Sequence, residues 1–261
     1  MPGDDLTSHP LMGGAPTWLP LAHAPALADG AAHVWLADVE RLRPMLDLFA
    51  GLLSDDERRR ADAFARPDDR QRFTLTHGLL RRLLGEYLEV SPAELRFRTE
   101  AHGKPWLASP SSPMAFNVSH ADACVLIAVA RGREVGVDIE RVGGQSADHL
   151  SAADFFSTEE RASLAALPAD ERLEAFYRCW TRKEAYLKAT GAGLTTPLDA
   201  FTVPLTPIPP SQRRLLTESS APGARRWRLQ DLPPVEGYAA SLVLSHTPQR
   251  ATSLMWVRFE P

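Results

Sequence analysis

The chain has 261 residues, 44% of them hydrophobic, and can bury a full core as one large domain or two compact halves. Its 29 Lys and Arg against 33 Asp and Glu give a formal charge of -4, which argues against bulk attraction to nucleic acid or an anionic membrane. It also lacks an apolar run of the roughly 20 residues that a membrane span needs, and a signal-peptide pattern. We therefore expect a cytoplasmic protein with no nucleic-acid or membrane partner, in which any phosphate recognition is local.

An irregular segment, a strand and a short helix are expected first along the chain. Residues 1–30 are rich in Pro, Gly and Ala without clear periodicity, which predicts an irregular lead-in. Residues 33–36 predict the first strand. Ser54 and Glu57 have the spacing of a capping box, so a short helix is expected to start there and to end at Pro67.

A long amphipathic helix is expected next, from Asp69 to just before Ser91. Its apolar residues recur at helical spacing: Phe73, Leu75, Leu79, Leu80, Leu83, Leu84 and Leu88. A short strand is expected after it, at residues 95–98.

The same order of signals returns in the second part of the chain. Ser157 and Glu160 form a second capping box, and Pro168 breaks the helix that they start. A second long helix is expected from Asp170 to Gly191, since glycine suits the residue that ends a helix.

Strands are expected after this second long helix, at residues 201–203 and 238–244. Two similar α+β halves related by duplication, residues 31–133 and 134–261, explain the repeated order. Chance is the alternative, since capping boxes are common and the halves share little identity. Concave sites form readily between domains, so we predict an α+β fold with its site at the interface of the halves.

Two apolar segments between the long helices predict a β-hairpin. Residues 124–130 and 135–140 flank a turn-like segment at 131–134. Antiparallel pairing across that turn brings Ser119-His120 near the Glu140 end of the second strand.

Two carboxylates share one face of that second strand. Because side chains alternate along a strand, Asp138 and Glu140 point away from the face that carries Val137 and Ile139. A solvated strand end is the alternative, and it is the default for an isolated Asp-x-Glu. The expected neighbourhood of His120 favours a functional site.

A stripe on the second long helix offers a third carboxylate. Trp180, Glu184 and Lys188 are spaced four residues apart and follow one another along the helix. An ordinary Glu–Lys pair, worth about 0.2–0.5 kcal/mol, is the alternative. Together with Asp138 and Glu140, however, Glu184 completes a set suited to Mg²⁺, which takes carboxylates with phosphate oxygens and waters.

These segments resemble the 4'-phosphopantetheinyl transferase superfamily, specifically its longer type, typified by the surfactin-synthetase activator. Four matching segments occur in order across residues 103–188, and the flanking helices extend the likeness over residues 54–245. The segments are Gly103-Lys104-Pro105, Phe116-Asn117-Val118-Ser119-His120, Val135-Gly136-Val137-Asp138-Ile139-Glu140 and Trp180-Thr181-Arg182-Lys183-Glu184-Ala185-Tyr186-Leu187-Lys188. The shorter type is trimeric and about half this length, so the resemblance implies a pseudo-twofold monomer of two α+β halves.

The resemblance also implies a reaction. The 4'-phosphopantetheine arm of coenzyme A would be transferred to a serine of an apo acyl or peptidyl carrier protein, releasing 3',5'-ADP. Asp138, Glu140 and Glu184 would ligate Mg²⁺, or Mn²⁺ in its place, and Lys188 would neutralise the phosphates. The longer type is often tied to polyketide or nonribosomal peptide biosynthesis in secondary metabolism.

Further residues would hold the nucleotide end of coenzyme A. The resemblance implies this role for Lys104, Ser119 and His120, with Arg60 near the 3'-phosphate. One position departs from the common pattern, because family members often carry a basic residue where Glu57 lies here.

The attack by a serine hydroxyl requires a proton acceptor. Glu184, directly or through a metal-bound water, is the first candidate, and His120 is the second. Residues 145–165, with Leu150, Phe155 and Phe156, are a candidate face for the carrier protein, although core packing is the more frequent use of such phenylalanines.

Two rival functions are weighed against transfer. An inactive carrier- or nucleotide-binding module of the same fold would be free to lose the acidic residues and Lys188, which are all present. A Mg²⁺-dependent pyrophosphate hydrolase would be expected to carry a Gly-rich phosphate loop or a Glu-rich helix, and the sequence has neither.

Overall fold

The computed structural model describes residues 17–20, 24–143, 153–209, 214–217, 225–233, 235–246 and 254–260. Its strands are β1 (Thr17–Pro20), β2 (Ala32–Asp38), β3 (Arg96–Thr99), β4 (Pro105–Ser109), β5 (Met114–Ala121), β6 (Cys124–Arg131), β7 (Val135–Arg141), β8 (Arg214–Thr217), β9 (Arg226–Asp231), β10 (Tyr238–Ser245) and β11 (Leu254–Glu260). Its α-helices are α1 (Val39–Leu42), α2 (Leu46–Leu52), α3 (Asp55–Asp62), α4 (Pro67–Leu88), α6 (Thr158–Ala166) and α7 (Ala169–Thr190). Single 3-10 turns lie at Arg43–Met45, Pro92–Glu94, Ala153–Phe155, Gly193–Thr195 and Leu198–Ala200.

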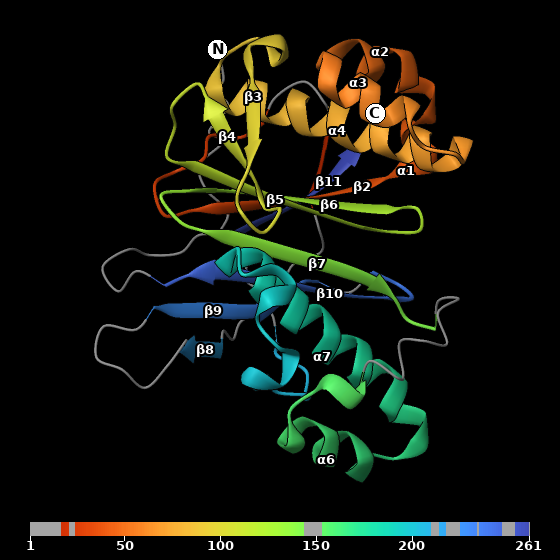
Figure 1. Cartoon of the computed structure of the whole chain (residues 1–261), viewed down its shortest axis with the longest axis vertical. Helices are drawn as coiled ribbons and strands as arrows, with labels where there is room; N and C mark the ends of the chain where they lie inside the picture. The colour runs from red at the N-terminus through yellow and green to blue at the C-terminus, as the bar shows by residue number, and fades with distance from the viewer. Residues whose placement is uncertain are drawn as a thin grey trace, which may run out of the picture.

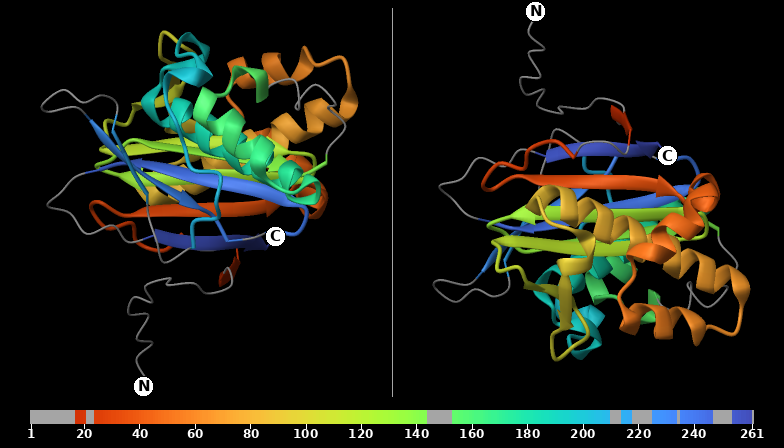
Figure 2. Two further views of the ribbon diagram at one scale, coloured as in Figure 1. Left: turned by 90° about the horizontal axis from the view of Figure 1, so that it is seen from below. Right: turned by 90° about the horizontal axis from the view of Figure 1, so that it is seen from above.

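Two stacked sheets with helices on their outer faces form the molecule (Figure 1). The first sheet has the strand order β1-β11-β2-β6-β5, the second has the order β7-β10-β9-β8, and β3 and β4 form a separate ribbon. Helix α4 and its neighbours cover the first sheet, and α7 crosses the second (Figure 2). The predicted α+β fold of two helix-covered halves is confirmed.

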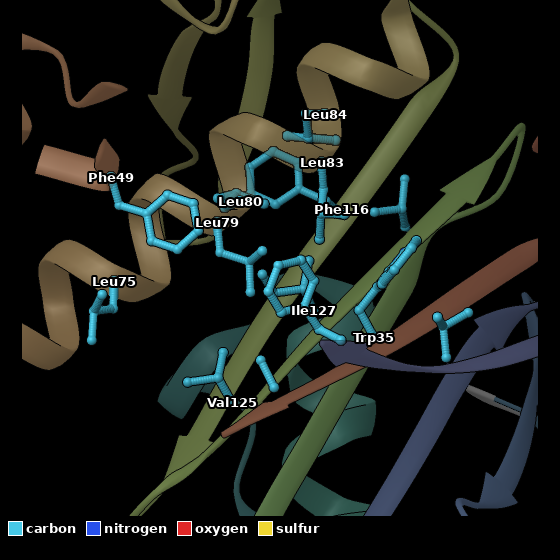
Figure 3. Packing of buried hydrophobic residues seen from close by; sticks show 14 of the residues in the cluster. Trp35, Phe49, Leu75, Leu79, Leu80, Leu83, Leu84, Phe116, Val125 and Ile127 are labelled. Carbon is cyan, nitrogen blue, oxygen red and sulfur yellow. The ribbon is translucent and has the colours of Figure 1, made fainter. Parts of the chain in front are cut away.

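Three apolar clusters hold these layers together. The predicted leucine stripe of α4 faces Trp35, Phe116 and Ile127 of the first sheet, as Figure 3 shows. A second cluster lies under α7, and a third fills the space between the two sheets. Val137 and Ile139 of β7 belong to the third cluster. Asp138 and Glu140, on the opposite face of this strand, therefore point towards α7.

The helix starts predicted from capping boxes are confirmed. Ser54 with Glu57, and Ser157 with Glu160, each form both reciprocal hydrogen bonds. Helix α3 nevertheless ends at Asp62 instead of at the proline, and Pro67 is the first residue of α4. A first-turn residue needs no N–H donor, so proline starts a helix more readily than it ends one.

The predicted strand at residues 201–203 is wrong, because this segment forms no ladder. Side chains satisfy its backbone instead. The Nζ atom of Lys183 donates to the carbonyl of Phe201 over 2.6 Å, and the amide of Val203 donates to Glu160 Oε1 over 2.7 Å.

The predicted hairpin of β6 and β7 is also wrong, because the two strands belong to different sheets. Strand β6 pairs with β2 and β5, and β7 pairs with β10. Strand β5 nevertheless runs parallel beside β7, since Asn117 Oδ1 accepts from the amide of Val137 (2.9 Å) and Ser119 Oγ from that of Ile139 (3.4 Å). Side chains of β5 thus replace the ladder that the hairpin would have made.

Strands from both ends of the chain complete the first sheet. Strand β11 lies parallel to both β1 and β2. Residues 17–20 therefore form a strand inside the predicted irregular lead-in, and the division of the chain at residue 133 stays a prediction. In the part of the chain that the structure describes, no helix combines the length and apolar character that crossing a membrane requires.

Candidate active site

Three elements meet where the two sheets come together: β5, β7 and α7. Gly136 on β7 allows this approach, because a Cβ atom there would lie 2.1 Å from the carbonyl oxygen of Ala185 and 2.3 Å from the amide nitrogen of Ala189 on α7. The helix backbone thus rests directly on the strand. The neighbouring carboxylates of β7 consequently face the Glu184–Lys188 stripe of α7.

Asp138 is the centre of a compact polar cluster. Ser119 Oγ donates to Asp138 Oδ1 over 2.8 Å, and Lys188 Nζ donates to the same oxygen over 2.6 Å and to Ser119 Oγ over 3.0 Å. Asp138 is only 2% exposed, and its Oδ2 atom is buried without a hydrogen-bond partner among the described residues. The structure thus brings together three of the predicted site residues, one from each element.

Burial and mutual repulsion perturb the carboxyl groups. Burial raises the pKa of Asp138, against the opposing charge of Lys188. Burial and the Asp138 charge raise the pKa of Glu140 to about 7, against the indole N–H of Trp180. Burial and Asp138 also raise the pKa of Glu184. Each of these groups would be stabilised as an anion by additional positive charge.

The donor chemistry fits a hard divalent cation, since it consists of three carboxyl groups with one unpartnered buried oxygen. In the described part of the chain, however, no three His, Cys, Asp or Glu side chains are gathered closely enough to hold an ion. In this arrangement Lys188 supplies the positive charge beside Asp138. A cation bound here would require the carboxylates to move closer together.

A cavity of about 250 Å³ opens beside this cluster, between α7 and the start of β4. Lys104, Asn117, Glu184 and Lys188 are among its lining residues. The Nζ atom of Lys104 donates to the carbonyl of Ala189 over 2.9 Å and pairs with Glu134, so its ammonium is held at the end of α7.

A second cavity, of about 290 Å³, lies against α4 and shares Val118 with the first. His120 lines it, and burial, followed by the charges of Arg72 and Lys188, lowers the pKa of this imidazole. Arg60 is not among the residues that line the cavity, but its guanidinium lies 5.2 Å from the centroid of the Phe73 ring, which does.

Sequence reasoning missed Arg72 and His77 as members of the site, and it assigned Phe73 only to the apolar stripe. They line the second cavity from one face of α4, at the helical spacing that the leucine stripe also follows. A search for polar residues on the face next to that stripe would have found Arg72 and His77.

The candidate carrier face at residues 145–165 is described only from residue 153, so Leu150 lies outside the described residues. Phe155 is 67% exposed, while Phe156 is buried and stacks on Phe176. Phe156 therefore belongs to the core under α7.

Comparison with known proteins places the chain among transferases. Residues 41–131 match a family described as 4'-phosphopantetheinyl transferase, N-terminal, and residues 134–243 match the 4'-phosphopantetheinyl transferase superfamily. The chain is 36% identical over 231 residues to the 4'-phosphopantetheinyl transferase HetI of Nostoc sp., covering 88% of this chain and 94% of that protein. It is 34% identical over 158 residues to the 4'-phosphopantetheinyl transferase Sfp of Bacillus subtilis, covering 60% of this chain and 68% of that protein.

Proposed function

The chain belongs to the 4'-phosphopantetheinyl transferase superfamily, in its longer type, and we propose that it places the 4'-phosphopantetheine arm of coenzyme A on a serine of an apo carrier protein. Membership makes it a transferase. The observation that carries the site assignment is the cluster of Asp138, Ser119 and Lys188, within 3.0 Å of one another and next to a cavity lined by Glu184.

We assign Asp138, Glu140 and Glu184 as the residues that would hold Mg²⁺. The unpartnered Oδ2 atom of Asp138 and the raised pKa of Glu140 support this assignment. When bound, the ion supplies positive charge to the pyrophosphate of coenzyme A.

The basic residues of the first cavity have separate roles. Lys188 is placed to donate to phosphate oxygens, because it lines the first cavity and its side chain is 29% exposed. Lys104 holds the nucleotide end with Ser119 and His120, and Arg60 lies near the 3'-phosphate. The positions of these side chains support the assignment, since each lines one of the two adjoining cavities or lies beside one.

The transfer step forms one bond and breaks one. The serine oxygen of the carrier attacks the phosphorus that bears the pantetheine arm, and the bond from that phosphorus to 3',5'-ADP breaks. Glu184 is the first candidate to accept the serine proton, because it lines the cavity beside Lys188. His120 is the second candidate acceptor.

The two halves of one chain supply both sides of the site, which supports action as a monomer. Carriers of polyketide or nonribosomal peptide synthesis are the proposed partners, and the cytoplasm is the proposed location.

Mass spectrometry of a carrier protein tests this function. The apo carrier is incubated with the protein, coenzyme A and Mg²⁺, and its intact mass is measured. We expect a gain of one phosphopantetheine and an equal amount of 3',5'-ADP. An unchanged carrier would support an inactive module, and coenzyme A cleavage without any carrier would support a hydrolase.

A further inference from the structure

Glu57 occupies the position where the family resemblance led us to expect a basic residue, and its carboxylate is turned inwards. Its Oε2 atom accepts from the amide of Ser54 over 2.8 Å and from Arg81 Nε over 2.5 Å. Burial alone would raise the pKa of Glu57, but hydrogen bonds from His77 and Ser54 and the charge of Arg81 lower it to about 2. Glu57 is therefore an ionised carboxylate held in one position, where it accepts hydrogen bonds from its neighbours.

One of those neighbours is His77 on α4. Its Nδ1 atom lies 3.2 Å from Glu57 Oε1, and its ring stacks on Phe73 with the centroids 4.0 Å apart. A carboxylate only accepts hydrogen bonds, so Nδ1 carries the proton. The second ring nitrogen, Nε2, is then the atom left for a ligand in the cavity that His77 lines.

Other polar groups enter the same cavity of about 290 Å³. Arg72 on α4 and His120 on β5 line it, as does Asp69, which pairs with Arg72. Thr76 lines it too, and its hydroxyl oxygen is buried without a hydrogen-bond partner among the described residues. Two imidazoles and a guanidinium line this cavity with a single carboxylate, which makes it suited to a small anion.

We infer that His77, held in place by Glu57, binds the 3'-phosphate of coenzyme A together with His120 and Arg72. His77 would thus supply from α4 the basic contact that Glu57 lacks on α3, and Glu57 would act as a positioning residue. The inference rests on the proposed function, because that function supplies the ligand.

The chemistry of the ring supports this pairing. Glu57 accepts a hydrogen bond from Nδ1, and a phosphate oxygen would accept one from Nε2, so the ring would link the two anions. A hydrogen bond between charged groups contributes more than a neutral one, and its loss corresponds to roughly tenfold or more in affinity.

Calorimetry with two nucleotides tests the inference without requiring catalysis. Adenosine 3',5'-bisphosphate and adenosine 5'-monophosphate differ only in the 3'-phosphate. We expect His77→Phe, which keeps an aromatic ring on Phe73, to weaken binding of the bisphosphate by about tenfold and to leave binding of the monophosphate unchanged. Glu57→Gln should also lower the ratio of the affinity for the bisphosphate to the affinity for the monophosphate.

Arg70→Gln is the matched control, because Arg70 is an exposed cation of α4 that does not line the cavity. It should keep the wild-type ratio of the two affinities. If His77→Phe does not fold, His77→Gln gives the second measurement, with the same expected loss.

An unchanged ratio, or an equal loss for both nucleotides, would overturn the inference. If the wild type modifies a carrier and His77→Phe keeps full preference for the bisphosphate, only the role of His77 fails. If the wild type neither binds the bisphosphate nor modifies a carrier, the proposed function fails with it.

Discussion

Asp138 receives hydrogen bonds from two other elements, since Ser119 on β5 and Lys188 on α7 both donate to its Oδ1 atom. Its carboxyl is buried, and Lys188 is the largest influence that opposes the resulting rise in its pKa. A buried carboxylate that loses its cationic partner is strongly destabilised. If a ligand phosphate drew Lys188 away, Asp138 would need another cation, which is the role assigned to Mg²⁺.

Glu184→Gln tests the base at the scale of a single side chain. Glutamine keeps the shape of glutamate but accepts no proton, so we expect kcat to fall by roughly a hundredfold or more. The affinity for coenzyme A should change far less. Steady-state kinetics and calorimetry measure the two quantities.

The control for this variant is Glu174→Gln, which removes an exposed carboxylate from the same helix. It should retain wild-type turnover. Wild-type kcat in Glu184→Gln would remove Glu184 from the mechanism.

His33 predicts a pH dependence of stability. Burial lowers the pKa of this histidine from 6.5 to about 4 in the folded protein, where its Nδ1 atom lies 2.7 Å from the hydroxyl of Tyr87. Between these two pH values the unfolded chain binds a proton that the folded chain does not. The free energy of unfolding should therefore fall as the pH decreases from 6.5 to 4, by about 3 kcal/mol in total.

Urea denaturation at a series of pH values measures this effect. His33→Gln removes the titrating group, so its free energy of unfolding should fall less steeply over the same range. Equal slopes for the variant and the wild type would rule out His33 as the cause.

At the scale of elements, the contact of α7 with β7 sets the geometry of the site, and Gly136 makes it possible. Gly136→Ala would place a methyl group about where the α7 backbone lies, so we expect the free energy of unfolding to fall by about 1–3 kcal/mol and transfer activity to fall with it. Urea denaturation measures the stability. Gly51→Ala is the control, since nothing lies within 4 Å of a Cβ atom there, and wild-type stability in Gly136→Ala would contradict the account.

A buried ion pair fixes α7 on its other side. Lys183 Nζ lies 2.8 Å from Glu160 Oε2, and both side chains have no exposed surface. Lys183→Met leaves the Glu160 carboxylate buried without its cation, so we expect a loss of about 3 kcal/mol in the free energy of unfolding. Thermal or urea denaturation checks the value, and the double variant with Glu160→Gln should recover part of the loss. A single variant as stable as the wild type would show that the pair contributes nothing.

Local signals predicted the helices well, because their causes lie within a few residues. The capping boxes at Ser54 and Ser157 and the left-handed Gly191 all formed as expected. The predicted pairing of β6 and β7 was wrong, because a three-residue connection does not reveal that β7 belongs to another sheet. Side-chain capping of β7 by Asn117 and Ser119 is a long-range contact that sequence spacing does not encode.

Some of the predicted site residues lie together, by a different route from the one expected. Ser119 does meet Asp138, but through parallel neighbours β5 and β7 and not through a hairpin. The polar face of α4 with His77 escaped prediction, since its contact with Glu57 spans 20 residues and depends on how α3 packs on α4.

At the scale of the whole molecule, two helix-covered sheets stack so that the inner strands β5 and β7 lie side by side (Figure 1). The proposed site lies at this junction, with β7 and α7 on one side and Ser119-His120 of β5 on the other. Strand β11 returns to the first sheet, so the halves are tied by the chain as well as by the apolar cluster between the sheets. A junction of this kind can hold charged groups in register across the two sheets.

The cluster around Asp138 is proposed to perform phosphopantetheine transfer. Its most direct test is the intact mass of an apo carrier protein after reaction with coenzyme A and Mg²⁺, comparing the wild type with Asp138→Asn. We predict a carrier heavier by one phosphopantetheine with the wild type and an almost unmodified carrier with the folded variant. Equal modification by both proteins would contradict the account.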